Sequence, residues 1–436
     1  MPEPAPPPPP EERDSPHART LAGEAGRSKK STPPAAFEPV LTPAFVRVLV
    51  GNFLFFMTFA TFFLLPIYIH ELGGDDQTVG LVMGVSGIAS LVGIFAVAAL
   101  IDRLGARFFS RVGFVCMTLV ALGFSHVGEL GAEFFALRII QGLAFACGFN
   151  GNSTLAATLA PPSRRATALG FFGISTLTTH ALAPALGEQL AGLIGFPSLF
   201  AMAAVFSAIG CVVTWSLTEP TMGTRRERKS PLSLTTPLVA TMAATAFCGV
   251  SFGSVMTFIP TFVVAAKLGP VATFFLSYAS AAITSRFFVG SLVDRVGHFR
   301  IILPGMVALS LAIAALAVVD STLQLIAVGL WFGLAQGVVF PTLNAWTVGL
   351  GTLEQIGRIQ SLFNGVFNVG ITLEAFLFGP IVHHFGHRPM FVAAGAASLF
   401  GAGLFSVAQA AFARLPAGQT ATSDLEPPAP GPELSD

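Results

Sequence analysis

Apolar runs of about 20 residues recur along this chain between short polar stretches. At about 1.5 Å per residue, a helix of that length crosses a hydrocarbon core of roughly 30 Å. With 53% hydrophobic residues, 11% charged residues and a mean hydropathy of +0.73, the chain cannot hide its apolar surface as a soluble globule. The runs therefore predict membrane-spanning helices, whose backbone polar groups pair within each segment.

Twelve runs meet this description, so the predicted fold is an all-α membrane protein with twelve transmembrane helices. The predicted limits are 45 to 70, 79 to 101, 108 to 127, 134 to 158, 166 to 194, 198 to 218, 236 to 265, 271 to 293, 301 to 319, 322 to 347, 356 to 382 and 389 to 413.

Basic residues predict the orientation. If both termini are cytoplasmic, the opposite face carries only Lys267 and Arg388, while Arg138 and Arg286 fall within spans and every other Lys or Arg is on the cytoplasmic side. Such asymmetry is what the positive-inside rule requires of a multi-pass protein of the cell (plasma or inner) membrane. The balanced net charge of zero gives no reason to expect a nucleic acid partner.

The chain divides into two similar parts. Residues 45–218 and 236–413 each hold six predicted spans, joined by a polar loop at 219–235, and residues 1–44 and 414–436 are predicted cytoplasmic tails. Sequence features recur between the parts at offsets of 192 to 196 residues: Asp102 and Asp294, Pro66 and Pro260, Gln141-Gly142 and Gln336-Gly337, Pro184 and Pro380. This pattern predicts two pseudo-symmetric six-helix bundles.

Short acidic loops after the second and eighth predicted spans carry a family resemblance. The first holds Asp102, Arg103, Gly105 and Arg107; the second holds Gly290, Asp294, Arg295 and Gly297. With the span count, the repeat and the Arg138-x-x-Gln141-Gly142 motif, the chain resembles the major facilitator superfamily of transporters over residues 45 to 413. It departs from the family pattern at Ala98, where a glycine is usual, and lacks the double basic ending of both loops.

The resemblance implies that the two bundles pivot about a central cavity. It also implies that the loop residues form a cytoplasmic latch, in which the acid of each loop docks against the amino end of a helix in the opposite half. Gly105 and Gly297 would permit the turn that ends each helix. The alternative is that these are ordinary charges at the membrane interface.

Ionisable residues at membrane depth are candidates for proton coupling: Glu374, His180 and Arg138. A bare carboxylate there costs about 2.5 kcal/mol or more, so Glu374 is either a proton carrier or a static acid paired with a helix donor. His180 either shares this role or bonds a neighbouring helix. Arg286 is interpreted as a residue that reaches the interface or serves the latch.

Polar side chains within spans are candidates for lining the cavity: Asn52, Gln141, Asn150, Gln336, Asn344, Asn364 and Asn368. For Asn364 and Asn368, which lie one turn apart on one face, the alternative is that they join helices. Most of the 42 phenylalanines are expected to face lipid, with Phe62 and Phe258 as exceptions. Helix kinks are predicted at Pro184 with Gly187 and at Gly379 with Pro380. Exporters of the superfamily carry a Gly-Pro-x-x-Gly signature, and here Ala183 replaces its first glycine.

The resulting functional prediction is a secondary transporter that exports a small organic molecule, such as a drug-like compound or secondary metabolite, in exchange for protons. The alternatives are proton-coupled uptake of a sugar or organic acid and a receptor or enzyme on this scaffold. No catalytic motif, cofactor or metal site is expected, since His383, His384 and His387 read as a solvated outer loop rather than zinc ligands. The partners are the solute, protons and lipid, and the protein is expected to act as a monomer.

Overall fold

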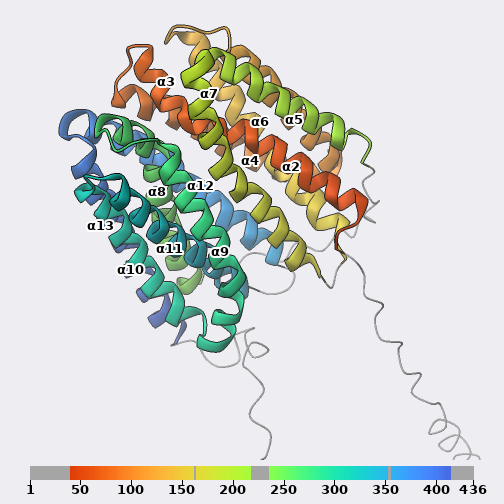
Figure 1. The fold of residues 1–436 in the computed structure, drawn as a ribbon. Helices are drawn as coiled ribbons and strands as arrows, with labels where there is room; N and C mark the ends of the chain where they lie inside the picture. The colour runs from red at the N-terminus through yellow and green to blue at the C-terminus, as the bar shows by residue number, and fades with distance from the viewer. Residues whose placement is uncertain (1–39, 162–163, 218–234, 352–354, 414–436) are drawn as a thin grey trace, which may run out of the picture. The chain divides into compact units, whose positions relative to one another are not determined.

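The computed structural model describes residues 40–161, 164–217, 235–351 and 355–413, and these contain no strand (Figure 1). The predicted tails and the polar loop therefore lie almost wholly outside the described residues. The helical elements are α2 (Pro43–Thr61), η2 (Phe62–Leu64), α3 (Leu65–Glu71), α4 (Asp76–Leu104), α5 (Ala106–Phe124), α6 (Ala132–Leu159), α7 (Arg165–Trp215), α8 (Thr236–Ala265), α9 (Ala272–Val296), α10 (His298–Ala315), η4 (Leu316–Val318), α11 (Thr322–Gly349), α12 (Ile356–Phe385) and α13 (His387–Phe412).

Ten helical segments of the described chain are long and apolar enough to cross a membrane, where the sequence predicts twelve. Two predicted spans, 166–194 and 198–218, are continuous in α7, which leaves helical geometry at Gly195 with φ 78° and ψ 161°. Helix α9 is not among the ten because its hydroxyl residues and Arg286 make it less apolar than the others. The number twelve therefore stays a prediction.

Helices from the same half of the chain pack together: α2 on α7, α5 on α6, α8 on α13 and α9 on α11 (Figure 1). Two extended interfaces join the halves, because α4 packs along α12 and α7 packs along α9. The described chain from Val40 onward forms one compact unit. The division into two bundles that move separately thus stays a prediction.

The sequence repeat is visible in the backbone. Gly105, between α4 and α5, has φ 84° and ψ 150°, and Gly297, between α9 and α10, has φ 87° and ψ 152°. A side chain is strained at such positive φ values, so glycine is required where each pair of helices turns. The two acidic loops therefore share one local conformation.

The repeated Gln-Gly pair is explained by helix packing. A Cβ on Gly142 of α6 would strike the backbone oxygen of Ser86 on α4, and a Cβ on Gly337 of α11 would strike the hydroxyl of Ser285 on α9. Small residues at such crossings let helices approach closely, which is a main source of stability in lipid.

The prolines predicted to kink helices lie inside them, Pro184 in α7 and Pro380 in α12. The break in α7 is instead at Gly195. Gly379 contacts the backbone of α4 at Gly80, where its Cβ position is 3.1 Å from Cα. Kinks at the two prolines stay a prediction, and Gly379 serves the packing of α4 against α12.

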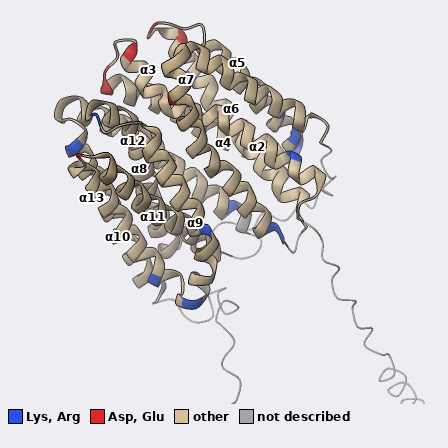
Figure 2. Ribbon diagram, in the orientation of Figure 1, with Lys and Arg blue, Asp and Glu red and all other residues tan. Residues whose placement is uncertain are grey.

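Charged residues gather at opposite ends of the helices (Figure 2). We call one end the arginine-rich end; its described basic residues are Arg47, Arg103, Arg107, Arg111, Arg164, Arg165, Arg295, Arg300 and Arg358. We call the other the acidic end; it holds Glu71, Asp75, Asp76, Glu129, Glu133 and Asp320, together with Lys267 and Arg388.

Replacement of Gly142 tests the packing of α6 on α4. Gly142→Ala is expected to lower the free energy of unfolding by about 1–3 kcal/mol, because a backbone oxygen faces the new methyl group and cannot rotate away. Thermal unfolding in detergent measures the loss. Gly403→Ala on α13 is the control, since nothing lies within 4 Å of its Cβ position; equal effects of the two substitutions would contradict the packing account.

Candidate functional site

A cavity of about 310 Å³ is lined by residues from both halves of the chain. This volume lies at the lower end of the range of about 300–1,000 Å³ typical of sites for small organic ligands. Much of the wall is aromatic, formed by Phe56, Phe59, Phe62, Phe63, Phe145, Phe149, Phe252, Phe340 and Phe367. The sequence-based expectation that most phenylalanines face lipid does not anticipate this wall. Of the two phenylalanines named as exceptions, Phe62 lines the cavity and Phe258 does not.

The structure brings together six of the predicted polar residues on the cavity wall: Arg138, His180, Gln336, Asn364, Asn368 and Glu374. Four others lie outside the lining. Asn52 is buried and donates to the hydroxyls of Ser175 and Thr176 at 2.8 and 2.9 Å, so it joins α2 to α7. Asn150 donates to Ala146 O of its own helix. Gln141 bonds Arg138, and Asn344 is half-buried elsewhere on α11.

Arg138 is tied to its own half of the chain. The side chain is 4% exposed and donates to Gln141 Oε1, one turn away on α6, as well as to Val82 O and Met83 Sδ on α4. The Arg-x-x-Gln spacing therefore builds a unit that fixes α6 to α4, although Gln141 Nε2 is buried without a hydrogen-bond partner among the described residues. The same unit places positive charge at the cavity edge.

Glu374 on α12 is fully buried, with 0% exposure, and lines the cavity. Its Oε1 accepts a hydrogen bond of 2.7 Å from Thr257 Oγ1 on α8. Its Oε2 is buried and has no hydrogen-bond partner among the described residues. Gly253 on α8 makes room for this carboxyl, since a Cβ there would lie 2.5 Å from Glu374 Cγ.

Arg286 on α9 is the site residue that the sequence analysis misses. It lines the cavity instead of reaching the interface, and its Nε is buried without a hydrogen-bond partner in the described chain. Gly173 on α7 makes room for the guanidinium, because a Cβ there would lie 2.9 Å from its terminal nitrogen. The signal available in the sequence was an arginine inside a span of the second half, as Arg138 is in the first.

His180 on α7 packs between aromatic rings of both halves. Its ring centroid is 5.0 Å from that of Phe63 and 6.3 Å from that of Tyr278 on α9, and its Nδ1 is buried without a partner among the described residues. A polar ring thus lies where α7 meets α9.

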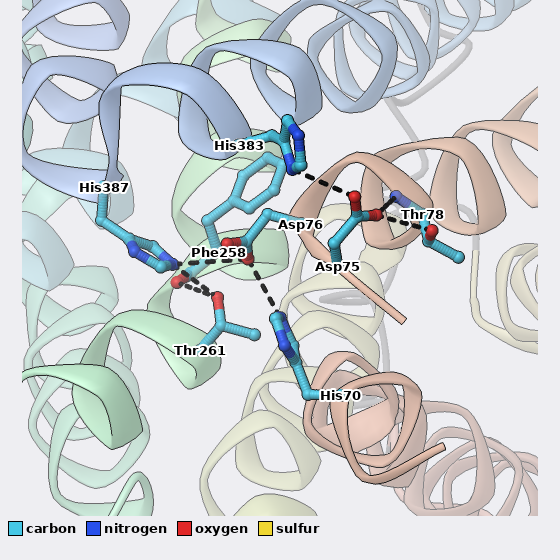
Figure 3. Close-up of polar contacts among 8 residues, drawn as sticks. All are labelled: His70, Asp75, Asp76, Thr78, Phe258, Thr261, His383 and His387. Carbon is cyan, nitrogen blue, oxygen red and sulfur yellow. Dashed lines mark hydrogen bonds and ion pairs between the residues drawn. The ribbon is translucent and has the colours of Figure 1, made fainter. Parts of the chain in front are cut away.

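Acid and histidine side chains join the two halves at the acidic end (Figure 3). Asp76 Oδ1, on α4, lies 3.1 Å from His70 Nε2 on α3 and 3.6 Å from His387 Nε2 on α13. Asp75 Oδ2 lies 3.0 Å from His383 Nδ1 on α12. Hydrogen bonds from Thr78, with a smaller effect of His383, hold the pKa of the Asp75 carboxyl below its usual value, so this carboxylate stays ionised.

The prediction of an outer loop at His383, His384 and His387 is therefore wrong, although His383 and His384 are exposed. His383 and His384 are the last turn of α12 and His387 begins α13, and two of the three contact acids of the other half. Within the described residues, no group of three or more His, Cys, Asp or Glu side chains is arranged to hold a metal ion.

In this geometry the Nε2 atom of His387 can either carry a proton or accept a hydrogen bond. Thr261 Oγ1 lies 2.8 Å from His387 Nε2 and 3.1 Å from Phe258 O. When the hydroxyl donates to Phe258 O, it can accept from His387 Nε2, and the Nε2–H group then also faces Asp76. When it donates to Nε2, that nitrogen carries no proton and the attraction to Asp76 is weakened.

Glu188 makes a further contact across the halves. This residue of α7 accepts hydrogen bonds of 2.8 Å from the backbone N–H groups of both Val271 and Ala272, where α9 begins. A carboxylate at a helix amino end satisfies free N–H groups and is favoured by the helix dipole. Sequence reasoning missed Glu188, although it directly follows the Pro184-x-x-Gly187 motif.

The predicted latch residues lie at the arginine-rich end. Asp102 and Arg103 are in the last turn of α4, and Asp102 forms no hydrogen bond or ion pair with another described residue. Arg107 donates to Leu217 O at 3.0 Å. Gly290 and Arg295 are exposed on α9, and the side chain of Asp294 lies outside the described part of the chain. The latch stays a prediction.

Loss of charge at Asp76 tests the closure at the acidic end. Asp76→Asn is expected to increase the population in which this end is open, because two histidine contacts lose their anionic partner. Electron resonance distance measurement between spin labels at exposed positions 129 and 323, in a background without the four native cysteines, reads the opening. Asp320→Asn is the control, since Asp320 pairs with Arg388 within one half; an unchanged distance distribution in Asp76→Asn would contradict the assignment.

Curated relatives of this chain are exporters by name. It is 25% identical over 378 residues to the Staphylopine export protein of Staphylococcus aureus, covering 80% of this chain and 92% of that protein. It is 23% identical to a multi-drug resistance efflux pump PmrA homolog of Lactococcus lactis, covering 75% and 85%. It is 25% identical to multidrug resistance protein MdtG of Salmonella paratyphi C, covering 80% and 91%.

Solved transporters share the fold. The nucleoside transporter NupG matches with a TM-score of 0.68 at 15% identity, covering 84% of this chain and 99% of that one. A bacterial homolog of the human lysosomal transporter Spinster, in an inward-facing and unoccupied conformation, matches with a TM-score of 0.72 at 13% identity, covering 86% and 98%. The sequence model of the Major Facilitator Superfamily matches residues 47–374. The chain therefore belongs to the Major Facilitator Superfamily and is a multi-pass membrane transporter, not an enzyme.

Proposed function

We propose that this transporter exports a small organic molecule in exchange for protons by alternating access. The observation that carries the proposal is Glu374, a fully buried carboxyl on the cavity wall with one oxygen unpaired among the described residues. The names of the relatives, two of them multidrug resistance proteins, support export rather than uptake.

The coupling follows from the cost of burying charge. An ionised carboxylate in a dry site at membrane depth costs about 2.5–3.5 kcal/mol or more, so Glu374 is neutral when its pocket is closed and empty. It can lose its proton when water or a solute reaches Oε2. If the solute and the proton compete for this one oxygen, each crossing carries one or the other, which is the requirement for exchange.

The proposed orientation in the membrane follows from the distribution of charge, and the proposed conformational state follows from the contacts at the acidic end. We place the arginine-rich end in the cytoplasm by the positive-inside rule, with both termini on that side of the cell membrane. The contacts of Asp75, Asp76 and Glu188 join the halves at the acidic end, which supports a state in which the cavity opens toward the cytoplasm.

The opposite state requires closure of the arginine-rich end. We propose that the bundles 45–218 and 236–413 pivot as units, in a monomer, and that Asp102 and Asp294 then dock on the opposite half. Asp102 is exposed, so its carboxylate is accessible for such a contact. Glu188 of α7, which binds the start of α9, is an example of this type of interaction, a carboxylate of one half against a helix amino end of the other.

Removal of the Glu374 carboxylate tests the exchange. In everted vesicles loaded with protons, a transported solute added outside should release protons from the lumen, and Glu374→Gln should abolish this release because the amide cannot carry a proton. A proton-sensitive dye measures the release over a panel of drug-like solutes. Glu129→Gln, an exposed acid at the acidic end, is the control.

Two results would overturn the proposal. Proton release by Glu374→Gln equal to that of the unmodified protein would remove the carrier role. Entry of protons together with the solute would indicate symport and therefore uptake.

A second substitution tests the latch. In the Asp76→Asn background, in which the acidic end opens, additional Asp102→Asn should reduce the population with a short distance between labels at exposed positions 104 and 300. The reason is that Asp102→Asn removes the charge of the acid that is proposed to dock. An unchanged population would show that Asp102 is an ordinary interfacial residue.

A further inference from the structure

Two groups of opposite charge line the cavity without a partner. Glu374 Oε2 and Arg286 Nε are both buried and have no hydrogen-bond partner among the described residues. A buried polar atom without a partner is costly, and more so when its group is charged. The cavity also holds three further buried atoms without a partner among the described residues, Ser90 Oγ, His180 Nδ1 and Gln336 Oε1. Such a cavity is suited to a polar ligand that pairs with the acid and the guanidinium.

The two groups do not pair with each other. The Glu374 carboxyl lies on α12, against Thr257 and Gly253 of α8. The Arg286 guanidinium lies on α9, against Gly173 of α7. No ion pair forms between these two described side chains, although both face the same 310 Å³ cavity. Acid and base are therefore held on separate walls.

Arg138 does not serve as a second anchor of this kind. Its guanidinium already bonds Gln141 Oε1, Val82 O and Met83 Sδ. Arg286, in contrast, has a buried Nε–H donor without an acceptor, and the described chain provides no acidic group to pair with its guanidinium.

Much of the surface of the cavity that both groups line is aromatic. Phe63, Phe252 and Phe367 are among the rings that line the same cavity. Such rings favour an apolar, preferably flat, body, and their faces also attract cations.

We propose, resting on the proposed function, that the solute is a zwitterion with an apolar or aromatic body. Its ammonium group binds Glu374 Oε2, and its carboxylate or equivalent acid binds Arg286. The ammonium competes directly with the proton for Glu374, which couples solute to proton. The acid group selects zwitterions over simple lipophilic cations.

Four derivatives of one amino acid test this assignment. 3-(1-Naphthyl)alanine is a zwitterion, its methyl ester is a cation, its N-acetyl derivative is an anion, and the N-acetyl methyl ester is neutral. Binding to the purified full chain is measured by the concentration dependence of thermal stabilisation. The zwitterion should bind at least about tenfold more tightly than each of the others, since each lacks at least one charged hydrogen-bond partner.

Two cavity variants assign each charge to its wall. Glu374→Gln should remove the preference for a free ammonium, so that the zwitterion and the N-acetyl derivative bind equally. Arg286→Gln should remove the preference for a free carboxylate, so that the zwitterion and the methyl ester bind equally, and Arg286→Lys should restore part of it. Glu129→Gln and Arg388→Gln, which make the same chemical changes outside the cavity, should alter neither preference.

The inference fails if the four compounds bind alike or not at all, if the cation binds most tightly, or if the preferences persist in both cavity variants. The thermal stability of each variant without ligand identifies any that does not fold; if Arg286→Gln does not fold, Arg286→Lys should show a reduced preference for the free carboxylate, and an unchanged preference would contradict the assignment. The two failures are distinguishable. Proton exchange in vesicles with cationic or neutral solutes, and not with zwitterions, would contradict the zwitterion inference but leave the proposed export function standing.

Discussion

Water is absent from the hydrocarbon core of a bilayer, so each polar group of a spanning segment needs its partner inside the protein. The helices satisfy the backbone, and several buried side chains follow the same rule in part: Arg138 donates to Gln141 Oε1, and the Asn52 amide nitrogen donates to Ser175 and Thr176. Asn52 Oδ1 and Gln141 Nε2 stay without a partner among the described residues. The charged exceptions that line the cavity, Glu374 and Arg286, are informative because the rule makes them expensive. Proton coupling and solute recognition are both assigned to these two groups.

Two kinds of contact join the halves: close packing of helices and polar contacts at the acidic end. Glycines let α4 lie against α12, where Gly379 meets Gly80. At the acidic end, Asp75, Asp76 and Glu188 bind partners of the second half through charge and hydrogen bonds. Such polar contacts depend on protonation and orientation, so they suit a contact that is made and broken in the proposed cycle. The tight glycine contacts suit the surfaces about which the halves would pivot in that proposal.

The sequence predicts much of this molecule, because lipid makes hydrophobic length a strong signal and the two halves confirm each other. The family, the helical class and the positive-φ turns at Gly105 and Gly297 follow from that signal. Spacing alone does not reveal which face of a helix meets its neighbours. Asn52 was therefore predicted at the cavity although it bonds α7, while Arg286, the phenylalanine wall and Glu188 were missed. These depend on contacts between helices more than 80 residues apart, such as that of Glu188 with Val271.

If Glu374 exchanges its proton for solute within a cavity that opens, its protonation can be read chemically. Carbodiimide reagents modify protonated carboxyls in apolar sites, and mass spectrometry identifies the residue that is modified. We expect labelling of Glu374 to decrease as the pH rises and a transported solute to protect it. Labelling that is independent of pH and of solute, or no labelling of Glu374 at any pH, would contradict the exchange of proton for solute at this carboxyl.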